Sequence, residues 1–424
     1  MDTTLYKRSR LMYIFEAALE YLISILVAGT YLAMITKELG VSDTLTGIIS
    51  SFISLGCVFQ LFVMLLRKGN TKKTVIALSV LNQLLFMSLY MIPLAGGGKN
   101  IKTAVFIAVI LFAYFFYNVA HPKKIDWFMS LVDYEKRGVF TAKKEMVSLI
   151  AGMVFTFVMG TLVDHCRAIG QMRAAFVICG AVIFVLMLLH TLTMIFTVEK
   201  PGEHTEKAKK RELLSVLKDK NILKITVVFV LWNIATYSST PYYGTYQIGE
   251  LGFSQSFVAV LSVLYAFARI SFSFMWGRSA DKCSFAEMLR LCFAVAALGF
   301  LFNVFCVPAN GKLFYTLYYI FNAIAMGGIN SALINLCYDY VEEEKRADAL
   351  AISLAIAGIF GFLSTLAVSP LVTYIQNRGN RILGMQVYAQ QVLSLIAFAA
   401  TLVTMLYISV FLIRRGDRKN GKKC

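Results

Sequence analysis

Charged residues are scarce in this sequence, and their scarcity is the first clue to its environment. They make up 15% of the 424 residues, whereas hydrophobic residues make up 58% and the mean hydropathy is +0.69. Soluble domains typically carry about 25% charged residues. This composition excludes an ordinary soluble domain and indicates an integral membrane protein.

The sequence also lacks the motifs of several enzyme classes. It contains no phosphate-binding glycine loop, no HExxH zinc motif and no nucleophile elbow. Its eight cysteines show neither the spacing of a metal site nor that of a disulfide framework. We therefore expect no enzymatic activity, no catalytic residue, no cofactor and no metal.

What the sequence does contain is a series of long apolar segments. Each has 20 or more residues, enough to cross a hydrocarbon layer of about 30 Å as a helix. We predict an all-α integral membrane protein with twelve transmembrane helices, over residues 11–35, 45–66, 74–95, 101–121, 145–164, 174–197, 223–247, 255–276, 285–308, 313–337, 348–375 and 389–413.

Lysine and arginine are distributed unevenly among the connections between these segments. The termini and alternate connections hold 32 of them, the other connections hold 8, and Arg269 alone lies well inside a segment. Because cytoplasmic loops are enriched in basic residues, both termini are predicted to be cytoplasmic. This topology, with contact to anionic lipid, accounts for the net charge of +17 without nucleic acid.

The chain divides into two halves at its most polar interval. We predict a six-helix bundle over residues 1–198, a basic cytoplasmic linker over 199–221 and a second six-helix bundle over 222–424. ELGVS begins at Glu38 and ELGFS at Glu250, each in the connection after the first segment of its half. In both copies we expect a glycine turn followed by a serine that caps the next helix.

A second correspondence supports this internal repeat. DYEKRG follows the fourth segment and DYVEEEKR follows the tenth, and Arg137 precedes Gly152 by the same 15 residues as Arg346 precedes Gly361. Two matches in the same order indicate a parallel duplication of one bundle.

The connection after the eighth segment reads GRSADKCS. It resembles GxxxD(R/K)xG, the signature of the major facilitator superfamily, at Gly277, Asp281 and Lys282, and Ser284 stands at the final glycine position. Together with the two-halved layout and the basic residues after the fourth segment, this resemblance identifies the chain as a bacterial-type member of the superfamily. It does not assign the chain to a subfamily. In the first half, LLRKGNTKK from Leu65 has no acidic residue at the aspartate position.

The resemblance implies a secondary transporter that works by alternating access around a central site, lined chiefly by the first, fourth, seventh and tenth helices. It implies that the signature connection belongs to a gate, in which Asp281 caps the next helix and pairs with a basic residue. We assign the gate to Gly277, Asp281, Lys282, Arg137 and Arg346.

Glu16 and Glu20 are the most informative polar residues within a span. Their i, i+4 spacing places both carboxylates on one helix face. A carboxylate at membrane depth must be paired with a cation or be protonated, so we predict a proton-coupling or cation site; a purely structural pair is the alternative. Arg269 needs an anion, which the Glu pair, an anionic substrate or a structural partner would supply.

Polar and aromatic residues in four other spans are candidates for substrate contacts. In the seventh span, Pro241 and Gly244 are expected to break the helix beside aromatic rings that could stack on a ligand, although an interfacial aromatic belt is equally consistent. We expect His190 to be a packed, hydrogen-bonded side chain and His121 to lie at a helix end. The substrate-binding prediction comprises Trp232, Asn233, Tyr237, Tyr242, Tyr243, Arg269, Asn118, Asn322 and Asn330.

The sequence therefore predicts a multi-pass protein of the cell membrane, monomeric and surrounded by lipid, that transports a small molecule. Proton-coupled uptake of a polar, sugar-like solute is the leading hypothesis, with Glu20 as the coupling carboxylate assisted by Glu16. A proton-coupled exporter of amphipathic compounds and a membrane sensor that does not transport are the alternatives.

Overall fold

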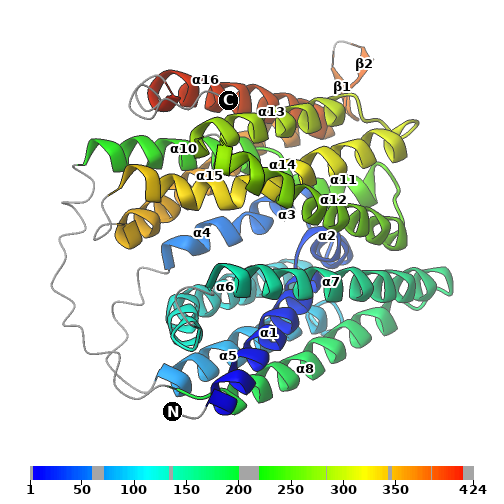
Figure 1. Cartoon of the computed structure of the whole chain (residues 1–424). Helices are drawn as coiled ribbons and strands as arrows, with labels where there is room; N and C mark the ends of the chain where they lie inside the picture. The colour runs from blue at the N-terminus through cyan, green and yellow to red at the C-terminus, as the bar shows by residue number, and fades with distance from the viewer. Residues whose placement is uncertain are drawn as a thin grey trace. The chain divides into compact units, whose positions relative to one another are not determined.

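The computed structural model describes residues 3–59, 71–132, 137–199, 219–282, 284–341, 346–382 and 384–413. The chain forms two compact units, the first made of Met1–Lys207 with Phe253–Val260 and the second of Ala208–Gly252 with Leu261–Cys424. Each unit is built almost wholly of helices (Figure 1).

In the first unit, α1 packs against α7 and α8, and α5 packs against α6 and α8. These contacts bring the first helix of the unit beside its last one. The helices are α1 (Thr3–Leu26), α2 (Gly29–Glu38), α3 (Asp43–Ser50), α4 (Phe52–Phe59), α5 (Thr71–Met91), α6 (Lys99–Met129), α7 (Arg137–Ala168) and α8 (Met172–Phe196).

In the second unit, α13 packs against α14 and α16, and α10 packs against α15 and α16. A two-stranded antiparallel hairpin pairs Arg381 with Gln386 and Ile382 with Met385. The elements are α10 (Lys220–Tyr237), η3 (Thr240–Tyr242), α11 (Tyr243–Gly249), α12 (Gln255–Lys282), α13 (Phe285–Val304), α14 (Gly311–Tyr340), α15 (Arg346–Asn377), β1 (Arg381–Ile382), β2 (Met385–Gln386), α16 (Ala389–Ile408) and the π-helix η5 (Ser409–Ile413).

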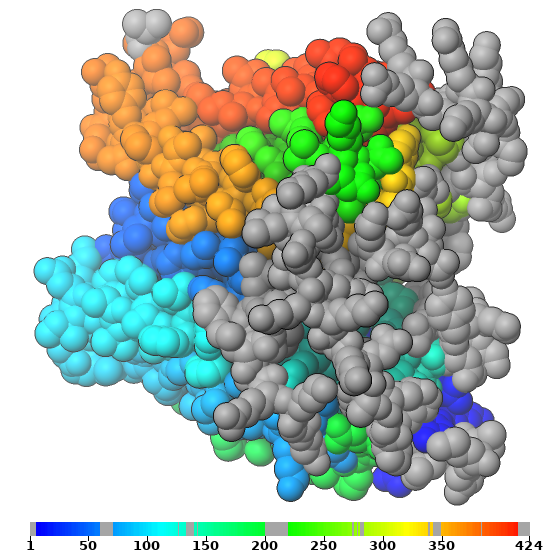
Figure 2. Space-filling model, turned by 90° about the vertical axis from the view of Figure 1, so that its left-hand side faces the viewer, coloured from blue at the N-terminus to red at the C-terminus, as the bar shows by residue number. Residues whose placement is uncertain are grey.

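The predicted number of membrane-spanning segments is confirmed. Within the described residues, 11 helical segments are long and apolar enough to cross a membrane, and Asp43–Phe59 adds a shorter apolar one. Large apolar side chains remain exposed on these helices, as on the outer surfaces of α6 and α15 (cyan and orange in Figure 2). Examples are Ile101 and Phe112 on α6 and Phe360 and Leu363 on α15. Such surfaces are stable against lipid but not in water.

The two ELG(V/F)S segments form the predicted turn and cap. Gly40 and Gly252 have φ values of 67° and 65°, in the left-handed region that favours glycine. Ser42 Oγ accepts a hydrogen bond from Leu45 N at 3.3 Å, and Ser254 Oγ accepts one from Phe257 N at 3.1 Å. The repeated segment is therefore a structural device that starts a helix.

Two predicted spans differ from the helices that the structure shows. The first is not one helix, because the chain breaks between α1 and α2 at Gly29, where φ is 53°. The fourth does not end before Pro122, because α6 continues through it to Met129. In the seventh span the predicted break is confirmed: α10 ends at Tyr237, and Pro241 lies in the 3₁₀ turn η3.

The signature stretch after the eighth span is also more helical than expected. Helix α12 extends to Lys282, so that Gly277 and Asp281 lie within it. The helix that follows is capped by Ser284, whose Oγ accepts a hydrogen bond from Glu287 N at 3.3 Å. The expectation that Asp281 caps α13 is therefore wrong. The corresponding first-half residues 65–70 lie outside the described part of the chain.

The described cysteines are consistent with the expected lack of a disulfide framework. Cys57, Cys166, Cys179, Cys292, Cys306 and Cys337 are all free. Burial raises the pKa of the Cys306 thiol, in the connection after α13, to about 12. This thiol is therefore protonated and poorly nucleophilic at neutral pH.

We predict that Gly252→Ala lowers stability by about 1–2 kcal/mol, because an alanine Cβ is strained in the left-handed region. No atom lies within 4 Å of the added Cβ, so backbone strain alone would account for the loss. The measurement is the melting temperature of the purified protein in detergent.

The matched control is Gly249→Ala, three residues earlier, where the added Cβ also meets open space but φ is not positive. This variant should melt at or slightly above the temperature of the unchanged protein. Equal effects of the two substitutions would show that the conformation of Gly252 does not limit stability.

Candidate functional site

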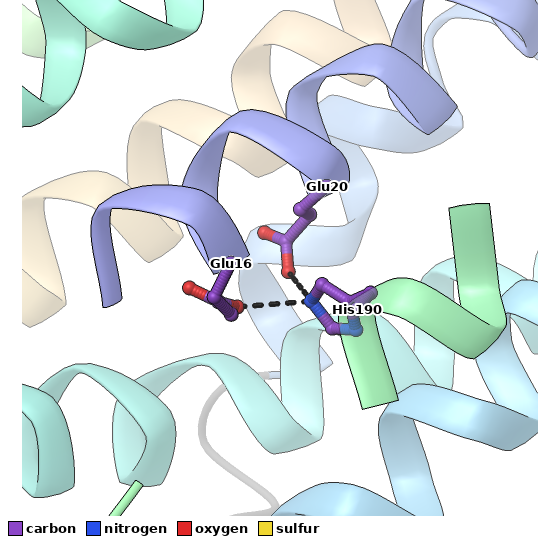
Figure 3. Close-up of side chains that lie close together, drawn as sticks. All are labelled: Glu16, Glu20 and His190. Carbon is purple, nitrogen blue, oxygen red and sulfur yellow. Dashed lines mark hydrogen bonds and ion pairs between the residues drawn. The ribbon is translucent and has the colours of Figure 1, made fainter. Parts of the chain in front are cut away.

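Four ionisable side chains meet inside the first unit. Glu16 and Glu20 come from successive turns of α1, as their spacing predicts, Lys124 comes from α6 and His190 from α8. We call these four residues the charge cluster. In Figure 3 the two carboxylates of α1 point toward the same nitrogen of the His190 ring.

The atoms of the charge cluster lie at hydrogen-bonding distances. Glu16 Oε1 is 3.0 Å from His190 Nε2 and 2.9 Å from Lys124 Nζ. Lys124 Nζ also contacts Glu20 Oε2, which lies 3.6 Å from His190 Nε2. One ammonium group therefore bridges both carboxylates.

Burial makes these pairs obligatory. The side chains of Glu16 and His190 are 1% and 0% exposed and that of Lys124 is 7% exposed, whereas Glu20 is 21% exposed. A buried charge without a partner costs several kcal/mol, so each charge here requires the others. Glu20 is the member of the charge cluster with most access to solvent.

The Nδ1 atom of the His190 ring also has a hydrogen-bond partner. Gln83 from α5 places its Nε2 atom 3.0 Å from His190 Nδ1. Gln83 is 1% exposed, and its Oε1 atom has no hydrogen-bond partner among the described residues. The expectation that His190 is packed and hydrogen-bonded is confirmed, and its partners are the carboxylates themselves.

Aromatic packing closes the charge cluster on one side. The Tyr13 ring stacks on Phe128 with the ring centroids 4.3 Å apart, and Phe128 stacks on Trp127 at 4.6 Å. Lys144 Nζ of α7 donates to Tyr13 Oη at 3.3 Å. The position of α1 against α6 and α7 is thereby fixed near Glu16.

The three anionic and imidazole side chains could also serve a metal ion. Glu16, Glu20 and His190 offer ligand atoms within 4.8 Å of one another. However, the Lys124 ammonium contacts both carboxylates, where a metal ion would have to bind. The arrangement therefore fits an internal ion-pair network better than a metal centre.

In this structure Lys124 is the cation that contacts both glutamates. The predicted span 101–121 leaves Lys124 in a connection, because a proline such as Pro122 normally ends a helix. A proline within a helix removes one backbone hydrogen bond, but neighbouring groups in a membrane bundle can compensate. Here α6 passes through Pro122 and carries Lys124 toward the carboxylates.

Three of the predicted substrate contacts lie in the packed interior of the second unit. Trp232 is 6% exposed and packs on Phe293, with ring centroids 4.8 Å apart. Buried Tyr242 donates from Oη to Thr365 O at 3.0 Å, and buried Tyr243 Oη lies 2.8 Å from Ser394 Oγ. The role of these three rings in substrate binding stays a prediction.

The other predicted contacts are more open, with one exception. Asn233, Tyr237, Arg269 and Asn322 are half-buried, and Asn330 is exposed. Asn118 of the first unit is 3% exposed, and its Nδ2 donates to Tyr114 O at 2.9 Å. Of the predicted gate residues, Gly277 is exposed, and the side chains of Asp281, Lys282, Arg137 and Arg346 lie outside the described part of the structure.

We predict that Lys124→Met lowers the unfolding free energy by about 3–5 kcal/mol at neutral pH, because it leaves two buried carboxylates without their cation. The loss should shrink at acidic pH, since protonated carboxyl groups need no counter-ion and the folded variant then binds more protons than its unfolded chain. Melting temperatures at two pH values measure both effects.

Lys123→Met is the matched control, because it removes the same charge one position earlier on α6. It should destabilise much less, and Glu16→Gln should partly restore the Lys124→Met variant. If both lysine variants melt alike, the ion pairs of Lys124 do not support the fold.

Comparisons with known proteins agree with this architecture. The solved structure of a mutant of the nucleoside transporter NupG superposes with a TM-score of 0.74, at 14% identity, over 95% of this chain and 100% of that one. The D-xylose-proton symporter gives 0.74 at 12% identity, over 95% and 97%. The E. coli fucose:proton symporter FucP gives 0.57 at 12% identity, over 96% and 98%.

A search of curated protein sequences gives no match. The family model of the Major Facilitator Superfamily, however, matches residues 14–365, which is most of the chain. Its members and the structural neighbours are transporters and not enzymes. The chain therefore belongs to the major facilitator superfamily and is a multi-pass membrane transporter.

Proposed function

We propose that this transporter couples the uptake of a small polar solute to the movement of protons, with the charge cluster as the coupling site. The observation that carries the proposal is the buried group of two carboxylates, one lysine and one histidine, in which Glu20, 21% exposed, is the most accessible member. Buried ionisable groups inside membrane spans are costly and commonly mark proton or ion pathways.

The charges of the cluster explain how a proton could bias the transporter. With His190 neutral, two carboxylates face one ammonium, so the cluster carries one uncompensated negative charge. Adding a proton removes that charge and changes the strength of the pairs that join α1 to α6 and α8. If the inward-open and outward-open states strain these pairs differently, protonation shifts the balance between them.

The proposed solute is a hydroxyl-rich molecule such as a sugar or nucleoside. The similar structures include a nucleoside transporter and symporters of D-xylose and fucose, which supports this class as a starting point. In the second unit, the half-buried Asn233, Tyr237 and Asn322 carry the amide and hydroxyl groups that such a solute would need.

We further propose the membrane topology that proton-coupled uptake would require. Both termini and the basic linker over 199–221 face the cytoplasm of the cell, and the linker joins the two predicted six-helix halves. In this topology the inner gate would be formed by residues at the cytoplasmic ends of helices. These residues are Gly277, Asp281, Lys282, Arg137 and Arg346.

We predict that Glu20→Gln abolishes accumulation driven by an inward proton gradient but preserves exchange of labelled solute across the membrane. The amide keeps the size of the side chain and one acceptor oxygen but cannot gain or lose a proton. The measurement is uptake by sealed vesicles, with a panel of labelled sugars and nucleosides used first to find a transported compound.

Glu38→Gln is the control, because Glu38 is an exposed carboxylate at the end of α2 in the same unit. It should accumulate solute normally. Undiminished accumulation by the Glu20→Gln variant would refute the assignment of the coupling site, and export of hydrophobic toxins instead of uptake would refute the proposed direction.

A further inference from the structure

We propose that the transported proton resides on His190, and that Gln83 is the positioning residue that accepts both charge states of the ring by turning its amide. This inference rests on the proposed proton coupling and deepens it, because it names the atom that gains the proton and a residue outside the charge cluster. Glu20 remains the exposed acid through which the cluster meets water.

One of the two orientations of the Gln83 amide corresponds to a neutral His190 ring. The Gln83 Nε2 atom can only donate, so His190 Nδ1, 3.0 Å away, must present its lone pair. The carboxylates can only accept when ionised, so His190 Nε2, 3.0 Å from Glu16 Oε1, must carry the hydrogen. With the Gln83 amide in this orientation, His190 is neutral and carries its hydrogen on Nε2.

In this neutral form, Nδ1 is the ring nitrogen that can accept a proton. A hydronium ion supplies the proton: one of its O–H bonds breaks, one N–H bond forms at Nδ1 and a neutral water molecule leaves, so that the ring charge changes from 0 to +1. The net charge of the cluster then changes from −1 to 0, while both bonds from Lys124 to the carboxylates stay in place. Protonation of Glu20 would also neutralise the cluster, but at the expense of a charged pair with Lys124.

Gln83 can adapt to the charged ring because its amide is held at one end only. Its Oε1 atom has no partner among the described residues, so a half-turn of the amide breaks no bond other than the one to His190. The half-turn brings Oε1 to face the new Nδ1–H, which then donates to it. The two orientations occupy the same volume, so the buried packing is unchanged.

Other titratable groups on the neighbouring helices interact with the carboxylates and the lysine of the charge cluster. Besides the carboxylates, α1 contributes Tyr13, α6 contributes Lys124, Tyr117 and His121, and α7 contributes Lys144, which donates to Tyr13. Lys124 and Lys144 oppose a charge on the ring and the two glutamates favour it. Gln83 is the neutral side chain on α5 that contacts the ring directly.

The test follows the protonation of His190 in the purified full-length protein, and therefore needs no knowledge of the solute. The chain has four histidines, and their ¹⁵N-labelled rings can be followed by nuclear magnetic resonance between about pH 5 and pH 9. The signal missing from His190→Gln identifies His190. It should change from the neutral Nε2–H form to the imidazolium form within this range.

Gln83→Glu places an anion against Nδ1 and should raise the pH of half-protonation of His190 by about one unit or more. Gln83→Leu removes the acceptor and should lower it. Asn82→Asp is the matched control, since Asn82 donates to Ala113 O on α6 and does not contact the ring; it should shift the midpoint much less than Gln83→Glu.

A His190 ring that stays in one form throughout the range would overturn the proposal, as would equal midpoints in the Gln83→Glu and Gln83→Leu variants. The unchanged protein suffices for the first of these outcomes, so failure of a variant to fold leaves the proposal testable. If Glu20→Gln abolishes accumulation but His190 does not titrate, proton coupling stands and the proton resides on a carboxylate instead.

Discussion

The bridge from Lys124 to the two carboxylates of α1 is the interaction on which the first unit depends. It joins α6 to α1 in an interior where each separate charge would be strongly unfavourable, and His190 extends the connection to α8. The apolar side chains of these helices can pack in several similar ways, but the charges are satisfied in one arrangement. The same bridge therefore determines both the packing and the electrostatics of the unit.

In the proposed mechanism, such a network suits transport because it is stable but incompletely neutralised. Lys124 pairs with both carboxylates and leaves the cluster one positive charge short. A fully balanced network would have no reason to bind a proton. The histidine between Glu16 and Gln83 would take up that proton while the pairs of Lys124 stay in place.

The sequence predicted the features that depend on local spacing. The helices, the shared face of Glu16 and Glu20, the break near Pro241 and the two glycine–serine caps all follow from residues within a few positions of one another. The partners of the glutamates come from α6 and α8, more than 100 residues away in the chain. The sequence did not predict that Lys124 lies on the helix of the fourth span, because a proline normally ends a helix and Pro122 does not.

The length of α6 and α7 has a further consequence for the membrane around the protein. With 31 and 32 residues, they extend over about 46–48 Å at 1.5 Å per residue, well beyond a hydrocarbon layer of about 30 Å. Such helices must tilt or project into the headgroup region, and they can absorb a change in bilayer thickness by tilting further. Because Lys124 lies on α6, a change in lipid chain length would act mechanically on the ion pairs of the proposed coupling site.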